Sequence, residues 1–336
     1  MKIYYFKDPV GNFGDDLNSW LWDTLIPGYF DSDDTVRLSG IGTIINTSMP
    51  MARKWFVFSS GVGYGYPPVN FGDDNWNILC VRGPLSAKIL GLDKNKAITD
   101  GAALLNTLDE FKPLPENERK GIIFIPHHHA LLSGQWELAC KLSNIEFVNP
   151  QWDSKIVIQK IRHAKMVIAD AMHAAIIADA MRVPWVPVIT SPQINTFKWL
   201  DWTQTINLSY EPKVLGASSF REAYRSRTLS LYGEKYYIDT LSVDDAVEDF
   251  YRKRNLKSKK WWRSYKTTTE KMVFSGPNKL LSNLGFDKHF DEPYQANVVK
   301  NLMGLKESSG FLSEDKYFYR NIERLLECKE SLLKLK

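Results

Sequence analysis

One histidine and two aspartates are the residues best placed to transfer protons. His173 lies in the first turn of a helix expected at 171–181, where the helix dipole disfavours a second proton on the ring unless an anion is bound nearby. Asp15 opens a predicted helix and Asp100 follows a predicted strand, and both carboxylates would suit contact with a substrate hydroxyl. The same patterns also fit a buried structural histidine and two helix-capping aspartates, so the sequence leaves both interpretations open.

Arg82 is the cation whose surroundings best suit a phosphate or a carboxylate. Its planar guanidinium would lie beside the N-terminus of a helix that begins at Pro84. The alternative is an ion pair between Arg82 and an acid such as Asp100. Glycine-bearing turns follow two other strand-like runs, and their backbone N–H groups can face an anion or a sugar hydroxyl unless they serve only as tight turns; the residues concerned are Asn12, Gly14 and Gly61.

Three consecutive histidines, His127, His128 and His129, follow a predicted strand at 121–126. Neighbouring residues of an extended chain point to opposite sides, so at most two of these rings would share a face. No cysteine or acid lies near them at the spacing of a metal site. We therefore expect no metal here and keep the three histidines as candidates for contact with the substrate.

The elements that must position these residues are parallel strands joined by helices. Short apolar runs alternate with helical periodicity as far as about residue 190, which is typical of an α/β fold. The polar stretch 109–120, with seven charges and two prolines, indicates a surface linker. The predicted strands are 3–6, 55–58, 78–81, 97–99, 121–126, 146–148, 165–169 and 185–189, and the predicted helices are 15–26, 84–90, 136–142, 155–163, 171–181, 242–254 and 316–335.

We expect two α/β domains that face a cleft, residues 1–112 and 121–215. A helical, basic extension at 216–336 is expected to pack on both of them. In an open parallel sheet, the turns at the carboxyl ends of the strands line the crevice that binds a ligand. The candidate residues named above all follow such strand ends or lie in the turns beside them.

Composition excludes several classes of protein. The 336 residues are 44% hydrophobic and 24% charged, which is typical of a globular protein and excludes disordered and fibrous chains. The 43 Lys and Arg nearly cancel the 39 Asp and Glu, so the net charge of +4 gives no reason to expect a nucleic-acid partner. Three scattered cysteines, the lack of an apolar signal-peptide core at the N-terminus and the charges that interrupt the most apolar stretch, 166–189, together predict a cytoplasmic protein.

Aromatic and basic residues suggest two kinds of partner. Aromatic residues make up 13% of the chain, and their flat faces often stack on sugars, although large aromatics also fill cores. Residues 252–266 hold eight Lys or Arg and no acid, interleaved with Trp261, Trp262 and Tyr265. This mixture predicts peripheral association with an anionic membrane surface, on the inner face of the plasma membrane, with a solvated run of charges as the alternative.

Four segments, taken in order, resemble the polysaccharide pyruvyl transferase family. They are Gly-Asn-Phe-Gly-Asp at 11–15, Arg-Gly-Pro-Leu-Ser at 82–86, Asp-Gly-Ala at 100–102 and Met-His-Ala-Ala-Ile at 172–176. The resemblance covers roughly residues 1–205 and is nearest to the exopolysaccharide branch, in which 197–199 and 201–202 would also belong to the site. The resemblance implies a fold like that of GT-B glycosyltransferases and transfer of a pyruvyl group from phosphoenolpyruvate onto two sugar hydroxyls, which gives a ketal.

The resemblance also implies roles for individual residues. His173 is expected to donate the proton to the methylene carbon of phosphoenolpyruvate, and Asp15 or Asp100 to partner a sugar hydroxyl. Contacts with phosphoenolpyruvate are expected from Arg82, Gly83, Ala174 and Lys198. Contacts with the saccharide acceptor are expected from Asn12, Gly14, Gly61, His127, His128, His129, Trp199 and Trp202.

The sequence departs from the family pattern around the histidine. Ala171 stands where the family often has arginine, two positions before the histidine, and Ala174 stands where glycine usually follows it. Another cation must therefore bind the donor, and Lys198 is the first candidate, ahead of Arg162, Lys165 and Arg182.

We expect no metal or organic cofactor, and a saccharide acceptor that is carried on a lipid. Two rival functions remain open. A GT-B glycosyltransferase would release a nucleotide instead of phosphate, whereas a saccharide-binding scaffold would release neither.

Overall fold

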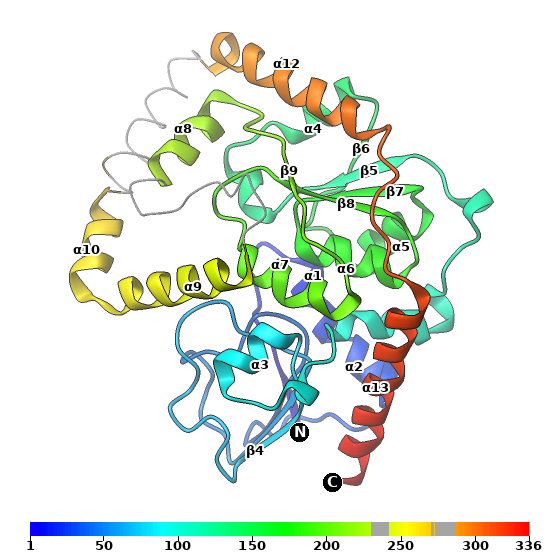
Figure 1. The fold of residues 1–336 in the computed structure, drawn as a ribbon, viewed down its shortest axis with the longest axis vertical. Helices are drawn as coiled ribbons and strands as arrows, with labels where there is room; N and C mark the ends of the chain where they lie inside the picture. The colour runs from blue at the N-terminus through cyan, green and yellow to red at the C-terminus, as the bar shows by residue number, and fades with distance from the viewer. Residues whose placement is uncertain (230–241, 270–271, 273–286, 336) are drawn as a thin grey trace.

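The computed structural model describes residues 1–229, 242–269, 272 and 287–335, and it contains two parallel β-sheets (Figure 1). The first sheet has the strand order β1-β2-β3-β4 and the second the order β6-β5-β7-β8-β9, and every pair of neighbours in both sheets is parallel. The strands are β1 (Lys2–Tyr4), β2 (Val36–Ser39), β3 (Lys54–Phe58), β4 (Trp76–Cys80), β5 (Ile122–Ile125), β6 (Glu146–Phe147), β7 (Met166–Ala169), β8 (Trp185–Ile189) and β9 (Lys213–Val214).

Central strands of both sheets are buried, as parallel strands covered by helices require. Every residue of β7 and β8 is buried, and four of the five residues of β3 are buried too. Continuous apolar runs of this kind produced the strand predictions, and the mixed α/β class is confirmed. The short strand β2 was not predicted, and the expected strand at 97–99 is wrong, because only Ala97 forms an isolated bridge, to Val81.

The helix predicted at 15–26 is broken into three short pieces. These are α1 (Phe13–Asp16), a 3₁₀ turn η1 (Leu17–Ser19) and α2 (Leu21–Leu25). Asn12, and not Asp15, caps the first piece, by accepting a hydrogen bond from the backbone N–H of Gly14. The break lies at Trp20, whose φ of −142° is not helical, and its indole N–H donates to Ser154 Oγ at 2.8 Å, 134 residues away in the sequence.

Helices with strong local signals lie where they are predicted. Pro84 begins α3 (Pro84–Leu90), and Gly91 ends it with a φ of 66°. The remaining helices of this part of the chain are α4 (Trp136–Leu142), α5 (Ser154–His163), α6 (Met172–Ala180), α7 (Thr196–Thr203) and α8 (Phe220–Leu229), with 3₁₀ helices η2 (Lys94–Lys96), η3 (Gly101–Thr107), η4 (Asp109–Phe111), η5 (Glu116–Glu118), η6 (His128–Leu132) and η7 (Gln204–Ile206).

Helix α6 connects the two halves of the molecule. All of its residues except His173 are buried. It packs against β7, β8 and α5 on the side of the second sheet, and against η3, which follows the first sheet. A residue in the first turn of α6 is therefore positioned by both sheets at once.

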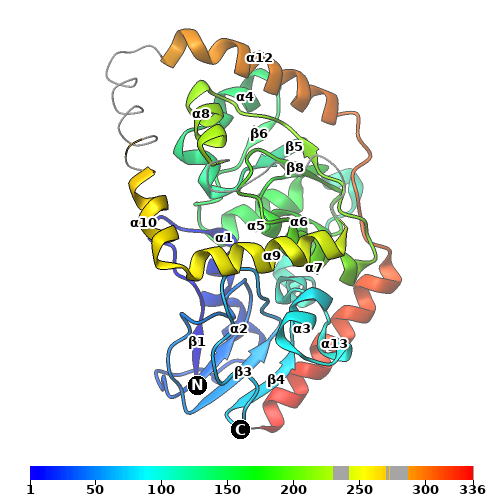
Figure 2. The same cartoon turned by 60° about the vertical axis from the view of Figure 1, so that its left-hand side comes forward.

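Four helices lie in the described residues after 241, and they cover different parts of the molecule (Figure 2). The first runs along α7, the third packs on α4 and α8 beside the second sheet, and the last packs on β4, η3 and η7 beside the first sheet. This packing on both halves agrees with the predicted extension, whereas the division into domains at 1–112, 121–215 and 216–336 stays a prediction. The four helices are α9 (Val243–Ser258), α10 (Lys260–Thr269), α12 (Asp287–Leu305) and α13 (Asp315–Lys334).

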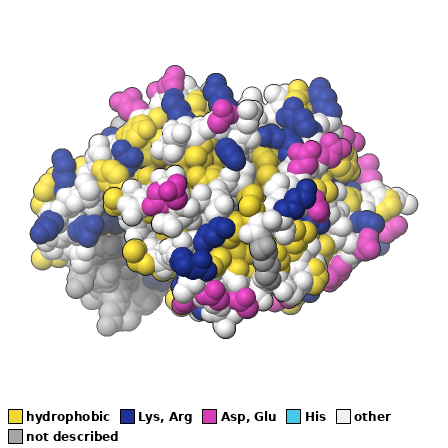
Figure 3. All heavy atoms as spheres, turned by 90° about the horizontal axis from the view of Figure 1, so that it is seen from below, with side chains coloured by type: hydrophobic (Ala, Val, Ile, Leu, Met, Phe, Trp, Pro, Cys, Tyr) yellow, Lys and Arg dark blue, Asp and Glu magenta, His cyan; other side chains and the backbone are white. Residues whose placement is uncertain are grey.

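The molecular surface mixes charges of both signs. The face shown in Figure 3 carries basic, acidic and apolar side chains interspersed with one another. Among the described residues, no helix combines the length and the apolar character that crossing a membrane would require.

Candidate active site

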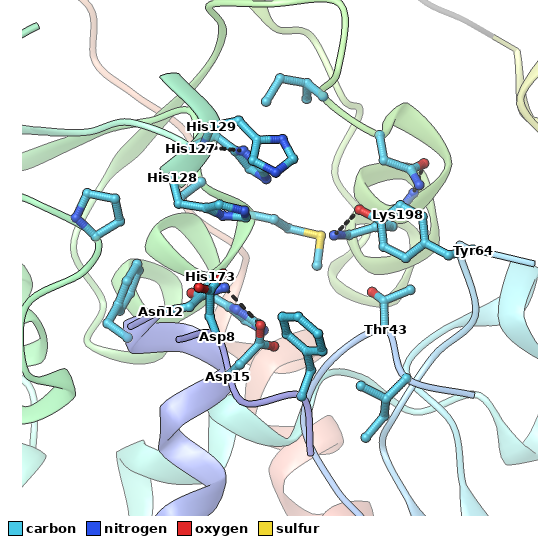
Figure 4. A pocket seen from close by; sticks show the side chains of 18 of the residues that line it. Asp8, Asn12, Asp15, Thr43, Tyr64, His127, His128, His129, His173 and Lys198 are labelled. Atoms are coloured by element: carbon cyan, nitrogen blue, oxygen red, sulfur yellow. Dashed lines mark hydrogen bonds between the residues drawn. The ribbon is translucent and has the colours of Figure 1, made fainter. Parts of the chain in front are cut away.

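A cavity of about 510 Å³ collects most of the predicted site residues (Figure 4). It is lined by the loops that follow β1, β2 and β3 of the first sheet and β5, β7 and β8 of the second, so the carboxyl ends of both sheets face it. The predicted residues that line it are Asn12, Asp15, His127, His128, His129, His173, Lys198 and Trp199. The predicted residues that do not line it are Gly14, Gly61, Arg82, Gly83, Asp100, Ala174 and Trp202.

His173 is held at the start of α6 with most of its ring buried. Its Nε2 atom lies 3.9 Å from Asp100 Oδ2, and neither of these buried atoms has a hydrogen-bond partner among the described residues. Burial, together with the charges of Lys198 and Arg82, lowers the pKa of His173 to about 3. Gly14 makes room for the ring, because a Cβ atom there would lie 1.9 Å from His173 Nδ1. Without a ligand, His173 is therefore a neutral imidazole.

Asp100 is fully buried behind the cavity and forms the helix cap that was its alternative role, whereas its contact with a substrate hydroxyl stays a prediction. Oδ1 accepts a hydrogen bond from the backbone N–H of Ala102 and so caps η3, while Oδ2 faces His173. Burial raises the pKa of Asp100 to about 6, against the lowering effect of the Arg82 charge. This carboxyl group can accept or release a proton close to neutral pH.

Asp15 lies in the cavity wall beside Asn12. Its Oδ2 atom accepts a hydrogen bond of 2.8 Å from Asn12 Nδ2. Burial raises the pKa of Asp15 to about 7, and although Lys198 opposes this shift, the nearby charges of Asp16, Asp100 and Asp8 add to it. The cavity wall thus holds a carboxyl group whose pKa is raised to near neutrality.

Lys198 enters the cavity from α7. Its Nζ atom donates a hydrogen bond of 3.2 Å to the Tyr64 hydroxyl, which comes from the loop after β3. Burial acts to raise the pKa of Tyr64, but the charge and hydrogen bond of Lys198 outweigh it, so that the pKa is lowered. This pair places a cation opposite His173 and Asp15, as Figure 4 shows.

Arg82 is fully buried beneath the cavity. Its Nε donates to Asp201 Oδ2 at 3.0 Å, Nη2 to the carbonyl of Val62, and Nη1 to Thr43 Oγ1 at 2.8 Å. The ion pair that the sequence offered as an alternative therefore forms, with Asp201 in place of Asp100. Of these partners Thr43 lines the cavity, so Arg82 reaches it through the Thr43 hydroxyl.

The other predicted residues outside the cavity support this buried network or the core. A Cβ atom on Gly61 would meet the Arg82 guanidinium at 2.6 Å, and one on Gly83 would meet the Asp201 carbonyl oxygen at 1.9 Å. The backbone N–H of Ala174 donates to the carbonyl of Ala171. Trp202 is buried and packs against the ring of Trp185.

The three consecutive histidines share one side of the chain, contrary to the expectation from an extended backbone. The 3₁₀ helix η6 begins at His128, and the resulting turn brings all three rings together. The ring centroids of His127 and His128, of His128 and His129, and of His127 and His129 are 4.3, 4.2 and 5.0 Å apart. The geometric reason for excluding a metal here is therefore wrong.

Two comparisons identify relatives of the chain. The family model for polysaccharide pyruvyl transferase matches residues 56–192. The succinoglycan biosynthesis protein ExoV of Rhizobium meliloti (strain 1021) is 40% identical over 224 residues, which are 66% of this chain and 70% of that protein. The chain belongs to the polysaccharide pyruvyl transferase family. It is accordingly an enzyme of the pyruvyltransferase class. No solved structure gives a significant match to the chain.

The family match covers only part of the site. Arg82, Asp100 and His173 lie inside the matched residues 56–192, while Asp15 and Lys198 lie outside them. The resemblance to the pyruvyl transferase family that the four sequence segments gave is confirmed. The cavity itself shows that residues from both inside and outside the matched region form one site.

Several residues of the cavity were missed by sequence reasoning. Asp170 directly follows an apolar run, as Asp100 does, so the same signal could have found it. It accepts hydrogen bonds from the backbone N–H of His127 and from the Thr190 hydroxyl. Thr43 gave no signal, since it follows the unpredicted strand β2, and Tyr64 lies in a glycine-rich turn that drew attention only to its glycines.

Proposed function

We propose that this enzyme transfers a pyruvyl group from phosphoenolpyruvate to two hydroxyls of a saccharide and so forms a pyruvate ketal during exopolysaccharide or cell-surface polysaccharide synthesis. The observation that carries the proposal is the cavity in which His173, at a helix N-terminus, faces Asp100 at 3.9 Å and shares the wall with Asp15 and Lys198. Family membership supplies the reaction class, and these groups supply its acid, base and cationic contacts.

The donor needs at least two contacts for its phosphate and carboxylate. The first backbone N–H groups of α6, at Met172 and His173, lie at the positive end of a nine-residue helix. Lys198 supplies a mobile cation in the same cavity and replaces the arginine that is absent at Ala171. Arg82 acts as a positioning residue, because its guanidinium holds the Thr43 hydroxyl at the cavity wall.

Proton transfer can follow a balanced sequence of steps. A proton from His173 adds to the methylene carbon of phosphoenolpyruvate, while a sugar hydroxyl oxygen forms a bond to the adjacent carbon and gives its proton to Asp15 or Asp100. The bond from that carbon to the phosphate oxygen then breaks, and inorganic phosphate leaves with the bonding electron pair. The second sugar hydroxyl closes the ketal, and its proton passes to a carboxylate or to His173.

The protonation states of the empty site suit this order of events. Burial keeps His173 neutral without a ligand, since its pKa is lowered to about 3. A bound dianion beside the ring would reverse this preference and charge His173 when the proton is needed. Asp15, whose pKa is raised to about 7, can hold the proton that a hydroxyl releases.

The proposal extends to the fold and to the acceptor. Two parallel sheets whose carboxyl ends face one cavity are the arrangement of GT-B-like enzymes, and we propose that class for this chain. The basic residues 252–266 lie on α9 and α10, where Trp261 is 58% exposed and Tyr265 41% exposed. Such a surface would hold the protein at an anionic membrane on the cytoplasmic side, beside a lipid-linked acceptor.

Incubation of the purified protein with phosphoenolpyruvate and a panel of synthetic and lipid-linked oligosaccharides tests the function. We expect mass spectrometry to show the gain of one pyruvyl ketal, with release of one phosphate for each ketal formed. The variant His173→Asn in the same panel is the control for contaminating activity. Release of a nucleotide from nucleotide sugars, with no phosphate from phosphoenolpyruvate, would instead identify a glycosyltransferase.

A further inference from the structure

Three histidines at the start of η6 form a cluster that has no part in the proton-transfer steps proposed above. His127, His128 and His129 lie together on the wall of the cavity, across from Asp15 in Figure 4. We propose that these three histidines bind one divalent transition-metal ion, with Zn²⁺ as the probe. This inference goes beyond pyruvyl transfer and does not depend on it, because it concerns metal binding by this cluster alone.

The geometry of the cluster suits a three-imidazole site. One ring nitrogen of each histidine can be chosen so that all three lie within 4.8 Å of one another. Zinc–nitrogen bonds of about 2.1 Å in a tetrahedral site require these nitrogens to lie about 3.4 Å apart. The remaining difference is of the size that side-chain rotation closes, and all three side chains are only partly buried.

The ring nitrogens are available to a metal. His129 Nδ1 is buried and has no hydrogen-bond partner among the described residues. His127 Nδ1 accepts a long hydrogen bond of 3.3 Å from the backbone N–H of His129, and a metal at this nitrogen would replace that weak bond. An orphaned nitrogen beside two further imidazoles is a donor set that favours zinc, copper or nickel over magnesium or calcium.

The protonation state of the cluster also suits metal binding. Burial lowers the pKa of all three histidines, to about 4 for His129. Neutral imidazole is the form that coordinates a metal, so burial acts in the same direction as the geometry of the cluster.

The charges around the cluster comprise two acids and two cations. The charge of Asp8 acts to raise the pKa of His128 and His129. Asp170 Oδ2 accepts a hydrogen bond of 2.8 Å from the backbone N–H of His127. The charge of Lys198 lowers the pKa of all three histidines, and that of Arg225 lowers the pKa of His129. Both positive charges would oppose a bound cation, whereas the charge of Asp8 favours it. Three neutral ligands would leave a fourth position of a tetrahedral ion open.

Metal binding by the whole chain, purified and stripped with a chelator, tests the proposal directly. Zinc is titrated in competition with a chromophoric chelator, and cobalt is titrated while its visible absorption is recorded. We expect one Zn²⁺ for each chain and a cobalt spectrum of tetrahedral intensity. The variants His128→Ala and His129→Ala should each weaken zinc binding by about tenfold or more.

A matched control separates this site from other histidines. His163→Ala removes an exposed histidine on α5, outside the cavity, and should leave the zinc stoichiometry and affinity unchanged. Circular dichroism and thermal melting show whether each variant is folded, and His128→Asn repeats the test with a polar side chain. The proposal is overturned if the wild-type protein binds no stoichiometric zinc, or if folded His128→Ala and His129→Ala proteins bind it as tightly as wild type.

Discussion

The two sides of the cavity differ in their titratable groups. The side that belongs to the first sheet supplies the carboxyl groups of Asp8 and Asp15, with Asp100 buried behind them, whereas the side that belongs to the second sheet supplies the imidazoles of His173, His127, His128 and His129 beside the carboxyl group of Asp170. Burial acts on both sides but moves the pKa values in opposite directions, up for the acids and down for the histidines. The difference shows that burial drives both sides toward neutral forms.

Lys198 is the cation that a charged donor would meet in this cavity. Its ammonium enters from α7, on the side of the second sheet, and meets the Tyr64 hydroxyl from the side of the first. Burial raises the pKa of Asp15 to about 7, which reduces the negative charge that a bound phosphate or carboxylate would face there. The predictions below test this contrast between acidic and imidazole sides.

The largest effect is expected from His173→Asn. A general acid contributes about 10²–10⁴-fold in rate, so kcat should fall by that factor while the melting temperature stays near that of wild type. A modest rise in the KM for phosphoenolpyruvate should accompany it, because the ring also faces the bound anion. Steady-state kinetics with His163→Asn as control measures this, and a folded variant within about threefold of wild type would exclude His173 as the acid.

Removal of Arg82 should act on stability more than on chemistry. The variant Arg82→Ala leaves Asp201 buried without its cation, and breaking such a pair costs about 3–5 kcal/mol of unfolding free energy. Denaturant unfolding measures the loss. Thr43→Val is the matched variant, since it removes the hydroxyl at the cavity wall and keeps the ion pair. If Arg82→Ala unfolded as wild type does, the buried network would have no structural role.

Loss of Lys198 should weaken donor binding. The variant Lys198→Met keeps much of the side-chain volume but removes the charge, and one charge-assisted contact is worth about 1.5–3 kcal/mol, or roughly 10–100-fold in the dissociation constant for phosphoenolpyruvate. Calorimetric titration measures it. Lys257→Met is the control, because Lys257 lies over the same Tyr64 ring at 5.6 Å but does not line the cavity. Equal donor affinity in wild type and Lys198→Met would mean that another cation binds phosphoenolpyruvate.

The two sides should give opposite pH dependences of stability. Between about pH 4 and 7 the unfolded chain releases the Asp15 proton while the folded chain keeps it, so this group lowers the unfolding free energy as pH rises. Between about pH 6.5 and 4 the unfolded chain protonates His129 while the folded chain does not, so this group lowers it as pH falls. Asp15→Asn and His129→Asn should each reduce the corresponding slope in denaturant unfolding, because Asp100 and His173 contribute to the same two slopes. A slope that is unchanged in its variant would contradict the pKa shift assigned to that residue.

The smallest effect is expected far from the cavity, at the basic helices. Wild-type protein should sediment with anionic vesicles at low salt and less so at high salt, since exposed cations are screened. Trp261→Ala together with Lys260→Ala should weaken this association and leave pyruvyl transfer to a soluble acceptor unchanged. Equal recovery of wild type in the supernatant with and without vesicles would show that residues 252–266 are a solvated run of charges and not a membrane-binding surface.

Helices and strands whose bounds are set by a few neighbouring residues could be predicted from the sequence. The helix at 136–142 and the strand at 185–189 have the predicted bounds, and Pro84 and Gly91 fix the ends of α3. In each of these the local preference and the tertiary environment agree. The helix expected at 15–26 is interrupted at Trp20, whose indole N–H donates to Ser154, a long-range contact that the local pattern could not indicate.

The candidate site also has features that the sequence could predict and features that it could not. The sequence by itself determined which strand ends carry polar residues, and hence that His173, Asp15 and the η6 histidines would face a common crevice. It did not determine which groups meet, because Arg82 and Asp201 are 119 residues apart and Lys198 and Tyr64 are 134 apart. Tertiary structure alone decided that Arg82 is buried in an ion pair and that Lys198 remains in the cavity, since the energy of burying a charge depends on the partner that packing brings to it.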